Sequence, residues 1–533
     1  MSGSLAIVLH AHLPFVRHPE HDRFLEESWL YEAITETYLP LIALLGRWRE
    51  DRLNARLTLT LTPTLCAMLG DPLLQARYER RLNGLVEFAE KEVVRTHWDR
   101  PRRVLAEGYV ERLTQLRSLW QRCERDLPGA FRQLQEANRI EIITSSATHA
   151  LLPLLAAEPS ALRAQVLVAR DHYRSCFGRD PVGIWLPECA YAPSIENVLR
   201  EANLRWFIVD SHGLRQGVPA PHFGTYAPVF TPDGLAVFGR DAESAEQVWS
   251  RHSGYPGDPR YRDFYRDAGF DLDFDYVRPY LPSPDHRGFT GIKYHRITGG
   301  AGPKRLYDPA AARKATQEHA AHFLAARRGQ LDRLAEVMDL PPILTAPYDA
   351  ELFGHWWHEG LDFLDAVVRQ AAELAPDLRF ETPTDYLRRH ATHQVVRPAA
   401  STWGEAGHLR VWLNEGNAWI QAHLRAAEAR MAALVREAKP GNELASRALR
   451  QAARELLLAE ASDWPFLLHT GTSPDYARSR VTTHLRRFQA LHDQLVEGRV
   501  DEEGLRRMEE ADNLFPGVDW RHWQLGAAIG ESL

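Results

Sequence analysis

The sequence predicts an α/β protein, in which parallel strands alternate with helices, followed by an all-helical carboxyl-terminal region. Three observations support this prediction. Short β-rich runs end abruptly in polar residues, apolar residues at helical spacing follow most of these runs, and the strand signal stops at about residue 396. Strands and helices in alternation form parallel βα units. About seven runs, each polar at its carboxyl end, predict a closed or nearly closed barrel. An open doubly wound sheet is the alternative, but the sequence shows no Gly-rich phosphate loop for its switch point.

The β-rich runs, each taken together with the polar residues that end it, occupy the following ranges in chain order: 5–12, 56–64, 139–149, 182–191, 204–212, 235–241 and 341–351. Helical spacing follows the fourth run from Ser194, a suitable amino-terminal cap, and the last run from Leu361. Barrel enzymes keep their chemistry at the carboxyl ends of their strands. The polar residues at those ends are therefore the first candidates for a functional site.

Two insertions interrupt the alternation of strands and helices. Residues 64–138 are helical and charged, and are too long for a simple crossover. Residues 239–300 are rich in Gly, Pro, Tyr and Asp, which predicts a long ordered loop over the mouth of the barrel. We therefore expect a catalytic barrel domain over residues 1–395 and a helical domain over residues 396–533.

Composition excludes several classes of function. The 533 residues are 44% hydrophobic and 25% charged with a net charge of -7, which is typical of a globular protein and disfavours sequence-independent nucleic-acid binding. Four cysteines without a C-x-x-C pair argue against a disulfide scaffold and a thiolate zinc site. The amino terminus lacks the pattern of a signal peptide, and no apolar stretch approaches the length of a membrane span. We expect a cytoplasmic protein.

Two carboxylates stand just beyond predicted strands in aromatic surroundings. Glu188 follows Pro187 in "IWLPECAY", and Asp349 lies in "APYDAELFGHWW". We expect a helix amino terminus to keep Glu188 ionised, as a nucleophile requires. Bulky aromatic neighbours could raise the pKa of Asp349, which suits a general acid. Two carboxyl groups with divergent pKa values are the pattern of glycoside cleavage. Taken singly, each carboxylate is more often a helix cap or a salt-bridge partner.

Five segments carry a resemblance to a known family. "HAHLP", "WLPECAY", "YDAELFGHWWHEG", "VFGRDAES" with the following "QVWS" and "GYPGD", and "ASDWPF" resemble the branching-enzyme subgroup of glycoside hydrolase family 57, in order over nearly the whole chain. The resemblance implies an incomplete (β/α)7 barrel with a helical carboxyl-terminal domain. It also implies a retaining reaction on α-1,4 linkages of starch-like glucans without a metal or other cofactor.

The resemblance assigns roles to individual residues. It implies that Glu188 is the nucleophile and Asp349 the acid/base, and retention requires their carboxyl groups to lie roughly 5 to 5.5 Å apart. Glucan contacts are expected from Trp403 and Asp463, and from Arg240 and Gly257 in the loop over the mouth. The residues themselves favour sugar-hydroxyl hydrogen bonds from His10 and His149, and a metal role for the alternating pair His10 and His12 is disfavoured. Trp412, which shares the loop of Trp403, is a further candidate for glucan binding.

We expect a 1,4-α-glucan branching enzyme that acts on an α-1,4-glucan as a monomer or weak homo-oligomer, without a nucleic-acid or membrane partner. The alternatives are an α-amylase or 4-α-glucanotransferase of the same family, a non-catalytic glucan-binding protein, and, more remotely, a metal-dependent deacetylase. Segment 213–233, where family members carry a shielding loop, looks short, with Tyr226 its obvious aromatic residue. A short lid would admit water to the intermediate and favour hydrolysis over transfer.

Overall fold

The computed structural model describes residues 3–250, 253–298, 303–438 and 441–525. The chain divides into two compact units, each assembled from segments far apart in the sequence. The first unit comprises Met1–Leu59, Leu69–Glu141 and Asp241–Tyr386, and the second comprises Thr60–Met68, Ile142–Arg240 and Leu387–Leu533. The expected division into residues 1–395 and 396–533 stays a prediction.

The larger sheet has five strands in the order β3-β2-β1-β8, and β9 also pairs with β1. Its strands are β1 Gly3–Ala11, β2 Leu57–Leu61, β3 Ile140–Ile143, β8 Ile343–Asp349 and β9 Leu378–Phe380. β1 is buried along its whole length, as a near-continuous apolar run in a covered parallel sheet should be. β1 and β8 pair in parallel, and their register places His10 opposite Asp349.

The smaller sheet belongs to the second unit and has the order β4-β5-β7-β6. Its strands are β4 Gly183–Ile184, β5 Trp206–Val209, β6 Val229–Phe230 and β7 Ala236–Gly239. β4, β5 and β7 are parallel, whereas β6 runs antiparallel to β7. The seven strands predicted from the sequence are all present. The short strands β6 and β9 were not predicted.

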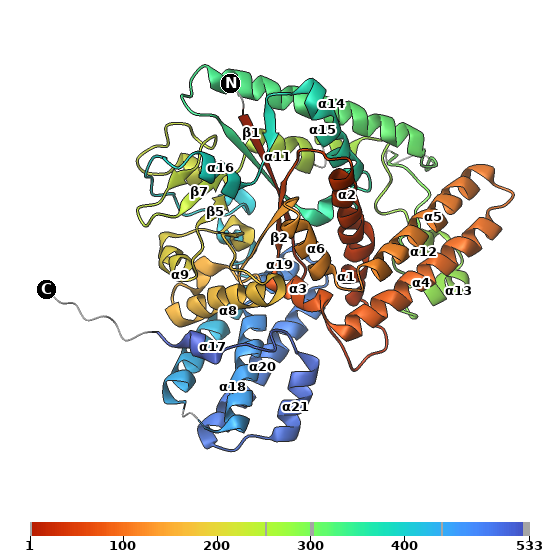
Figure 1. Ribbon diagram of the computed structural model, residues 1–533. Coiled ribbons are helices and arrows are strands. Elements are labelled where there is room, and N and C mark those ends of the chain that lie inside the picture. Colours follow the sequence, from red (N-terminus) through yellow and green to blue (C-terminus); the bar gives the residue numbers. More distant parts are fainter. Residues whose placement is uncertain (1–2, 251–252, 299–302, 439–440, 526–533) are drawn as a thin grey trace. The chain divides into compact units, whose positions relative to one another are not determined.

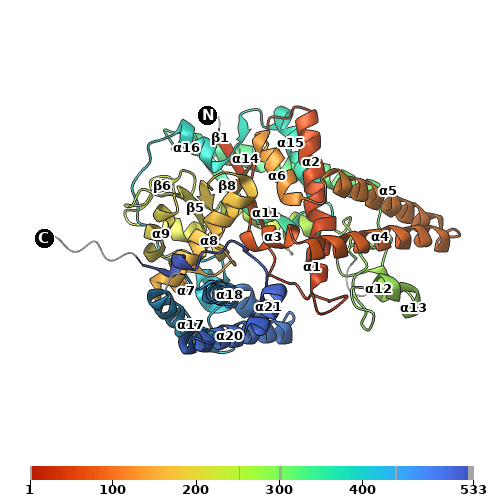
Figure 2. The same ribbon diagram turned by 60° about the horizontal axis from the view of Figure 1, so that its bottom comes forward.

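The predicted helical insertion contains two long helices, α4 Pro72–Arg95 and α5 Arg100–Arg122, which lie side by side (Figures 1 and 2). Each starts with an aspartate cap followed by proline in the first turn. Asp71 accepts a hydrogen bond from the Leu74 main-chain N–H at 3.0 Å, and Asp99 accepts one from the Arg102 N–H at 3.3 Å. This combination of cap and proline is the usual signal for a helix start.

The other helices of the first unit complete its framework. They are α1 Glu27–Ala33, α2 Leu39–Glu50, α6 Leu127–Glu136, α11 Ala242–Trp249, α12 Ala268–Asp271, α13 Phe274–Val277, α14 Pro309–Ala335, α15 Gly360–Leu374 and α16 Pro383–Arg389. Residues 239–300 were predicted to be an ordered loop, and their described part contains α11, α12 and α13, while residues 251–252 and 299–300 lie outside the described residues.

The helices of the second unit include the predicted carboxyl-terminal group. They are α3 Pro63–Leu69, α7 Leu152–Leu155, α8 Pro159–Phe177, α9 Glu196–Glu201, α10 Ser211–Arg215, α17 Ala418–Glu437, α18 Glu443–Ala459, α19 Asp463–Thr470, α20 Pro474–Glu497 and α21 Glu502–Ala511. α20 packs on α17, α18 and α19, which confirms the predicted helical region. None of the described helices is both long and apolar enough to cross a membrane.

Candidate active-site residues

Glu188 lies in a strained turn after β4. The main chain passes through the 3₁₀ turn Pro187–Cys189, in which Glu188 has φ 60° and ψ 25° and Cys189 has φ 49°. Residues other than glycine rarely adopt this left-handed conformation, and such strain clusters at functional sites. The next α-helix, α9, begins only at Glu196. The expectation that a helix amino terminus stabilises the Glu188 charge is therefore wrong.

Trp403 holds Glu188 through two hydrogen bonds. The indole Nε1–H donates to Glu188 Oε2 at 2.7 Å, and the Trp403 main-chain N–H donates to the Glu188 carbonyl at 3.0 Å. His149 Nδ1 lies 3.9 Å from Oε1 of the same carboxylate, whose side chain is 16% exposed. A hydrogen bond to a charged group contributes about 1.5–3 kcal/mol. The indole therefore fixes the orientation of the Glu188 carboxylate.

A second set of contacts positions Trp403. The Arg240 guanidinium carbon lies 5.5 Å from the Trp403 ring centroid, and the Trp185 ring meets Trp403 edge-on at 5.0 Å. Arg240 Nη1 donates to Asp210 Oδ2 at 3.2 Å, while His212 Nδ1 lies 3.1 Å from Asp210 Oδ1. Burial alone would raise the pKa of Asp210, but the Arg240 charge and the hydrogen bonds hold it below its usual range. An ionised Asp210 thus anchors the arginine beside the tryptophan that binds Glu188.

His149 lies in the loop after β3 and ties this loop to the helical region of the second unit. Its Nδ1 lies 2.8 Å from the Ser462 hydroxyl, and the Ser462 main-chain N–H donates to the His149 carbonyl at 3.2 Å. Ser462 immediately precedes Asp463, the first residue of α19. Asp463 therefore directly follows Ser462, the residue that His149 contacts.

Trp412 does not offer an aromatic face. It is 2% exposed and belongs to a small apolar cluster with Leu151 and Ala190, against which Trp403 packs. A buried ring cannot stack on a sugar, so its predicted glucan contact is replaced by a supporting role beneath Trp403. A β-carbon on Gly404 would lie 2.6 Å from the Trp412 ring, which explains glycine at that position.

Asp349 is positioned in the first unit by the register of a sheet. It is the last residue of β8 and lies opposite His10 in β1. His10 is buried, and its burial followed by repulsion from His12 lowers its pKa well below the usual value. The imidazole rings of His10 and His12 are stacked, with their centroids 5.9 Å apart. A neutral imidazole is suited to the predicted hydrogen bonding with sugar hydroxyls.

Glu351 is the main residue whose importance the sequence did not reveal. It is buried two positions beyond Asp349, and the Tyr38 hydroxyl donates a hydrogen bond to its carboxyl group. Burial first, and the charge of Asp349 second, raise the pKa of Glu351 to about 8. Glu351 therefore carries a proton at neutral pH beside Asp349.

The aromatic residues after Asp349 divide between the core and the surface. Trp357 is 1% exposed and belongs to the core, whereas Trp356 is 46% exposed. His355 Nδ1 lies 2.5 Å from Glu36 Oε2. Burial would raise the pKa of Glu36, but its bond to His355 and the neighbouring positive charges lower it to about 2. His355 thus stabilises the ionised form of Glu36.

Gly257 lies on an exposed part of the first unit. It ends the 3₁₀ turn Tyr255–Gly257, which is held by a 2.8 Å hydrogen bond between the Tyr255 hydroxyl and His322 Nδ1. Its predicted contact with glucan stays a prediction.

Two family models match the chain. The model described as glycosyl hydrolase family 57 matches residues 6–398, and the model described as 1,4-alpha-glucan branching enzyme, C-terminal, matches residues 423–523. The first match covers well over half of the sequence. The chain belongs to glycosyl hydrolase family 57.

Known proteins of similar sequence and fold agree with this membership. The 1,4-alpha-glucan branching enzyme TK1436 of Thermococcus kodakarensis is 35% identical over 97% of this chain and 78% of that protein. The α-amylase AmyC of Thermotoga maritima is 41% identical and has a TM-score of 0.93 over 99% of this chain and 100% of its own. The family 57 branching enzyme of Pyrococcus horikoshii is 32% identical, with a TM-score of 0.89 over 99% and 98% of the two chains. These similarities confirm the predicted fold class.

The segment expected to act as a lid in this family 57 chain is anchored at both ends. The main-chain N–H of Val218 donates to the Arg397 carbonyl at 2.9 Å, and that of Phe230 donates to the Gln394 carbonyl at 2.9 Å. Between these anchors, Tyr226 is half-buried. The segment is thus held to residues 394–397 at both Val218 and Phe230.

One group of residues could in principle hold a metal ion. Within the described part of the chain, Glu455, His484 and Asp512 form a buried cluster of suitable donor atoms. Arg480 donates to Asp512 Oδ1 at 3.0 Å, and Arg487 donates to the other oxygen. Two guanidinium groups already neutralise this carboxylate, so we interpret the cluster as an ion-pair network that joins α18 and α20 to the end of α21.

Proposed function

We propose that the chain is a retaining 1,4-α-glucan branching enzyme, which cleaves an α-1,4 linkage and transfers the released chain to a sugar 6-hydroxyl. The observation that carries this proposal is the match of residues 423–523 to the branching-enzyme carboxyl-terminal model, which adds to the family match of the barrel region. The named branching enzymes of similar sequence support the same activity.

In the proposed mechanism, Glu188 attacks the anomeric carbon and forms a covalent glycosyl-enzyme while Asp349 protonates the departing oxygen. Asp349 then removes the proton from the acceptor 6-hydroxyl, which attacks the anomeric carbon and releases Glu188. Trp403 contributes by holding Glu188 Oε2 at 2.7 Å, so that little reorientation is needed at the moment of attack. The mechanism requires a carboxyl separation of roughly 5 to 5.5 Å.

α-Amylase activity is the second candidate. It is favoured by the 41% identity to a protein titled an α-amylase and by the short, anchored segment around Tyr226. In that case water replaces the 6-hydroxyl as acceptor. Both activities use the same covalent intermediate, so they differ only in the fate of that intermediate.

We test the proposal with amylose as substrate, followed by proton NMR and a reducing-end assay. Branching produces a growing α-1,6 anomeric signal with few new reducing ends, whereas hydrolysis produces reducing ends alone. Glu188→Gln should abolish both signals while glucan binding persists, and Glu201→Gln, an exposed change on α9, is the matched control. Unchanged turnover in Glu188→Gln would contradict the assignment of the nucleophile.

Two further proposals concern the setting of the protein. All four cysteines are free thiols in the structure, which supports a location in the reducing cytoplasm. We also propose an α-1,4-glucan as the partner and a monomer or weak homo-oligomer as the working form. Size-exclusion chromatography with light scattering tests the latter.

A further inference from the structure

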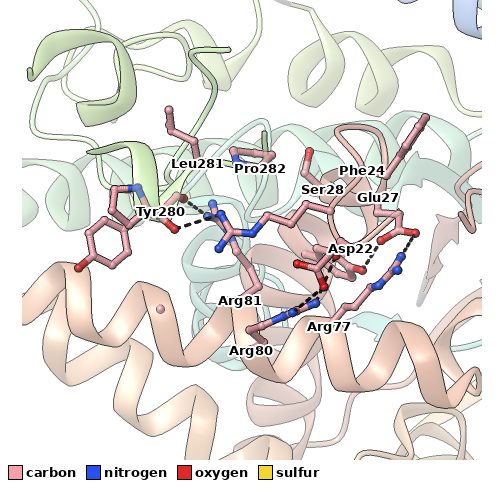
Figure 3. Close-up of a pocket in the computed structure, with 14 residues that line it drawn as sticks. Asp22, Phe24, Glu27, Ser28, Arg77, Arg80, Arg81, Tyr280, Leu281 and Pro282 are labelled. Atoms are coloured by element: carbon pink, nitrogen blue, oxygen red, sulfur yellow. Dashed lines mark hydrogen bonds and ion pairs between the residues drawn. The ribbon is translucent and has the colours of Figure 1, made fainter. Parts of the chain in front are cut away.

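A hollow of about 570 Å³, open to solvent, lies in the first unit, and none of the residues assigned above lines it. It is lined by the segment that leads into α1, by one face of α4 and by residues 279–282 (Figure 3). Four of its lining residues are arginines and two are carboxylates. This surplus of positive charge contrasts with the net charge of -7 of the whole chain.

The arginines are concentrated by helical spacing. Arg77, Arg80 and Arg81 stand at positions i, i+3 and i+4 of α4, and Figure 3 shows them extending from the same helix. Like charges at this spacing repel one another unless counter-charges are present. The helix therefore needs negative partners at this face.

The two lining carboxylates satisfy only part of that need. Glu27 is buried and binds Arg77 at 2.6 Å, while its second oxygen accepts a hydrogen bond from the Tyr31 hydroxyl at 2.9 Å. Asp22 pairs with Arg80 at 2.9 Å, but both side chains are largely exposed. Exposed ion pairs contribute little to stability, so Arg80 can turn toward a stronger anion at small cost.

Arg81 and Arg23 face the hollow without a carboxylate at ion-pair distance among the described residues. Arg81 donates to the main-chain carbonyls of Tyr280, Phe289 and Thr290, the last two at 3.1 and 3.3 Å. Arg23 donates to the Pro279 carbonyl at 3.3 Å. Burial lowers the pKa of Arg81 more than the attraction of Glu32 and Asp267 raises it. The charge of Arg81 is thus incompletely compensated inside the protein.

We propose that this hollow binds a phosphate dianion, either free or esterified to a sugar. Guanidinium groups match the geometry of phosphate oxygens, and hydrogen bonds between two charged groups are about twice as strong as neutral ones. Arg23, Arg80 and Arg81 supply the donors. Phe24 and Pro282 supply an apolar wall that lowers the local dielectric and can cover the face of an attached sugar.

The proposal is tested by calorimetric titration of the full-length protein with inorganic phosphate, glucose 6-phosphate and maltose in separate experiments. We expect inorganic phosphate and glucose 6-phosphate to bind, glucose 6-phosphate more tightly if the apolar wall covers the sugar, and both more weakly as NaCl is raised. Arg81→Gln and Arg23→Gln should each weaken phosphate binding at least tenfold. Arg506→Gln, which removes an exposed guanidinium on α21, should leave it unchanged.

Arg23→Gln guards against a folding defect, because Arg23 is exposed and its loss should leave the circular dichroism spectrum and amylose turnover as in the parent chain. The proposal is overturned if neither phosphate probe binds, or if both variants bind phosphate like the parent. Equal weakening by Arg506→Gln would also overturn it. Binding of maltose alone would overturn it in favour of an accessory glucan site. Since the binding of phosphate and of glucose 6-phosphate is measured without branching or hydrolysis, failure here is distinguishable from failure of the proposed function.

Discussion

The surroundings of Glu188 and Asp349 position a carboxylate in two different ways. Glu188 depends on a left-handed main-chain turn and on one indole hydrogen bond from Trp403. Asp349 depends on the register of β8 against β1 and is followed by the buried, protonated Glu351. Glu188 is therefore controlled by orientation and Asp349 by electrostatics. The two surroundings should therefore respond to different substitutions.

The largest effect separates the chemical roles of the two carboxylates. Asp349→Ala should lower turnover of amylose by about 10²–10⁴, the usual contribution of general acid–base catalysis. An aryl maltoside with a good leaving group needs no proton for departure, so its first step should lose much less. Burst kinetics with both substrates measure this contrast. An equal loss on both would show that Asp349 is not the proton donor.

The orientation of Glu188 is tested by Trp403→Phe. This change keeps an aromatic ring but removes the Nε1–H that donates to Glu188. If the lost bond to a charged group is worth about 1.5–3 kcal/mol, turnover should fall by about 10- to 100-fold. Trp356→Phe changes an exposed tryptophan of the first unit and is the matched control. A similar KM with lower kcat would locate the effect in orientation, whereas unchanged kcat would contradict it.

The sequence predicted the strands and both carboxylates because each signal is local. Apolar runs such as 341–351 end in turn-forming or charged residues, and Asp349 and Glu188 stand at those ends. The strands β6 and β9 escaped prediction because runs of two and three residues have no measurable periodicity.

The contacts that control the carboxylates are not local, and this is why the sequence did not reveal them. Trp403 binds Glu188 across 215 positions of the chain, and Tyr38 reaches Glu351 across 313. The positive φ of Glu188 also has no sequence signal, since no glycine occupies the turn. Trp403 and Trp412 lie in the same predicted loop, and the sequence does not show which of the two side chains is buried.

The electrostatic control of Asp349 is tested by Glu351→Gln. In the parent chain Glu351 should lose its proton near pH 8, which places a second negative charge beside Asp349. We expect the kcat of the parent chain to fall as the pH rises through about 8, and this alkaline fall to be absent in Glu351→Gln. At pH 6.5 the activity of the variant should lie within about threefold of that of the parent. A pH–rate profile of both proteins checks this. If the variant keeps the alkaline fall in kcat, a group other than Glu351 causes it.

The smallest effect concerns stability and leaves both carboxylate surroundings untouched. Glu428 on α17 and Glu460 at the end of α18 are buried, and burial raises the pKa of Glu428 to about 7 and that of Glu460 well above its usual value. Because these folded-state pKa values exceed those of the unfolded chain, the folded state binds more protons between about pH 4.5 and 7. The free energy of unfolding therefore falls as the pH rises through this range.

Glu428→Gln removes this loss, since the amide resembles the protonated acid and no longer repels Glu460. The melting temperature of the variant should equal that of the parent at pH 5 and exceed it by about 1–3 °C at pH 8. Glu437→Gln, an exposed change on the same helix, should show no such trend. Amylose turnover should match the parent at every pH. A pH-dependent change in kcat in Glu428→Gln would mean that electrostatic control reaches beyond the surroundings of Asp349, and the distinction between the two carboxylates would have to be redrawn.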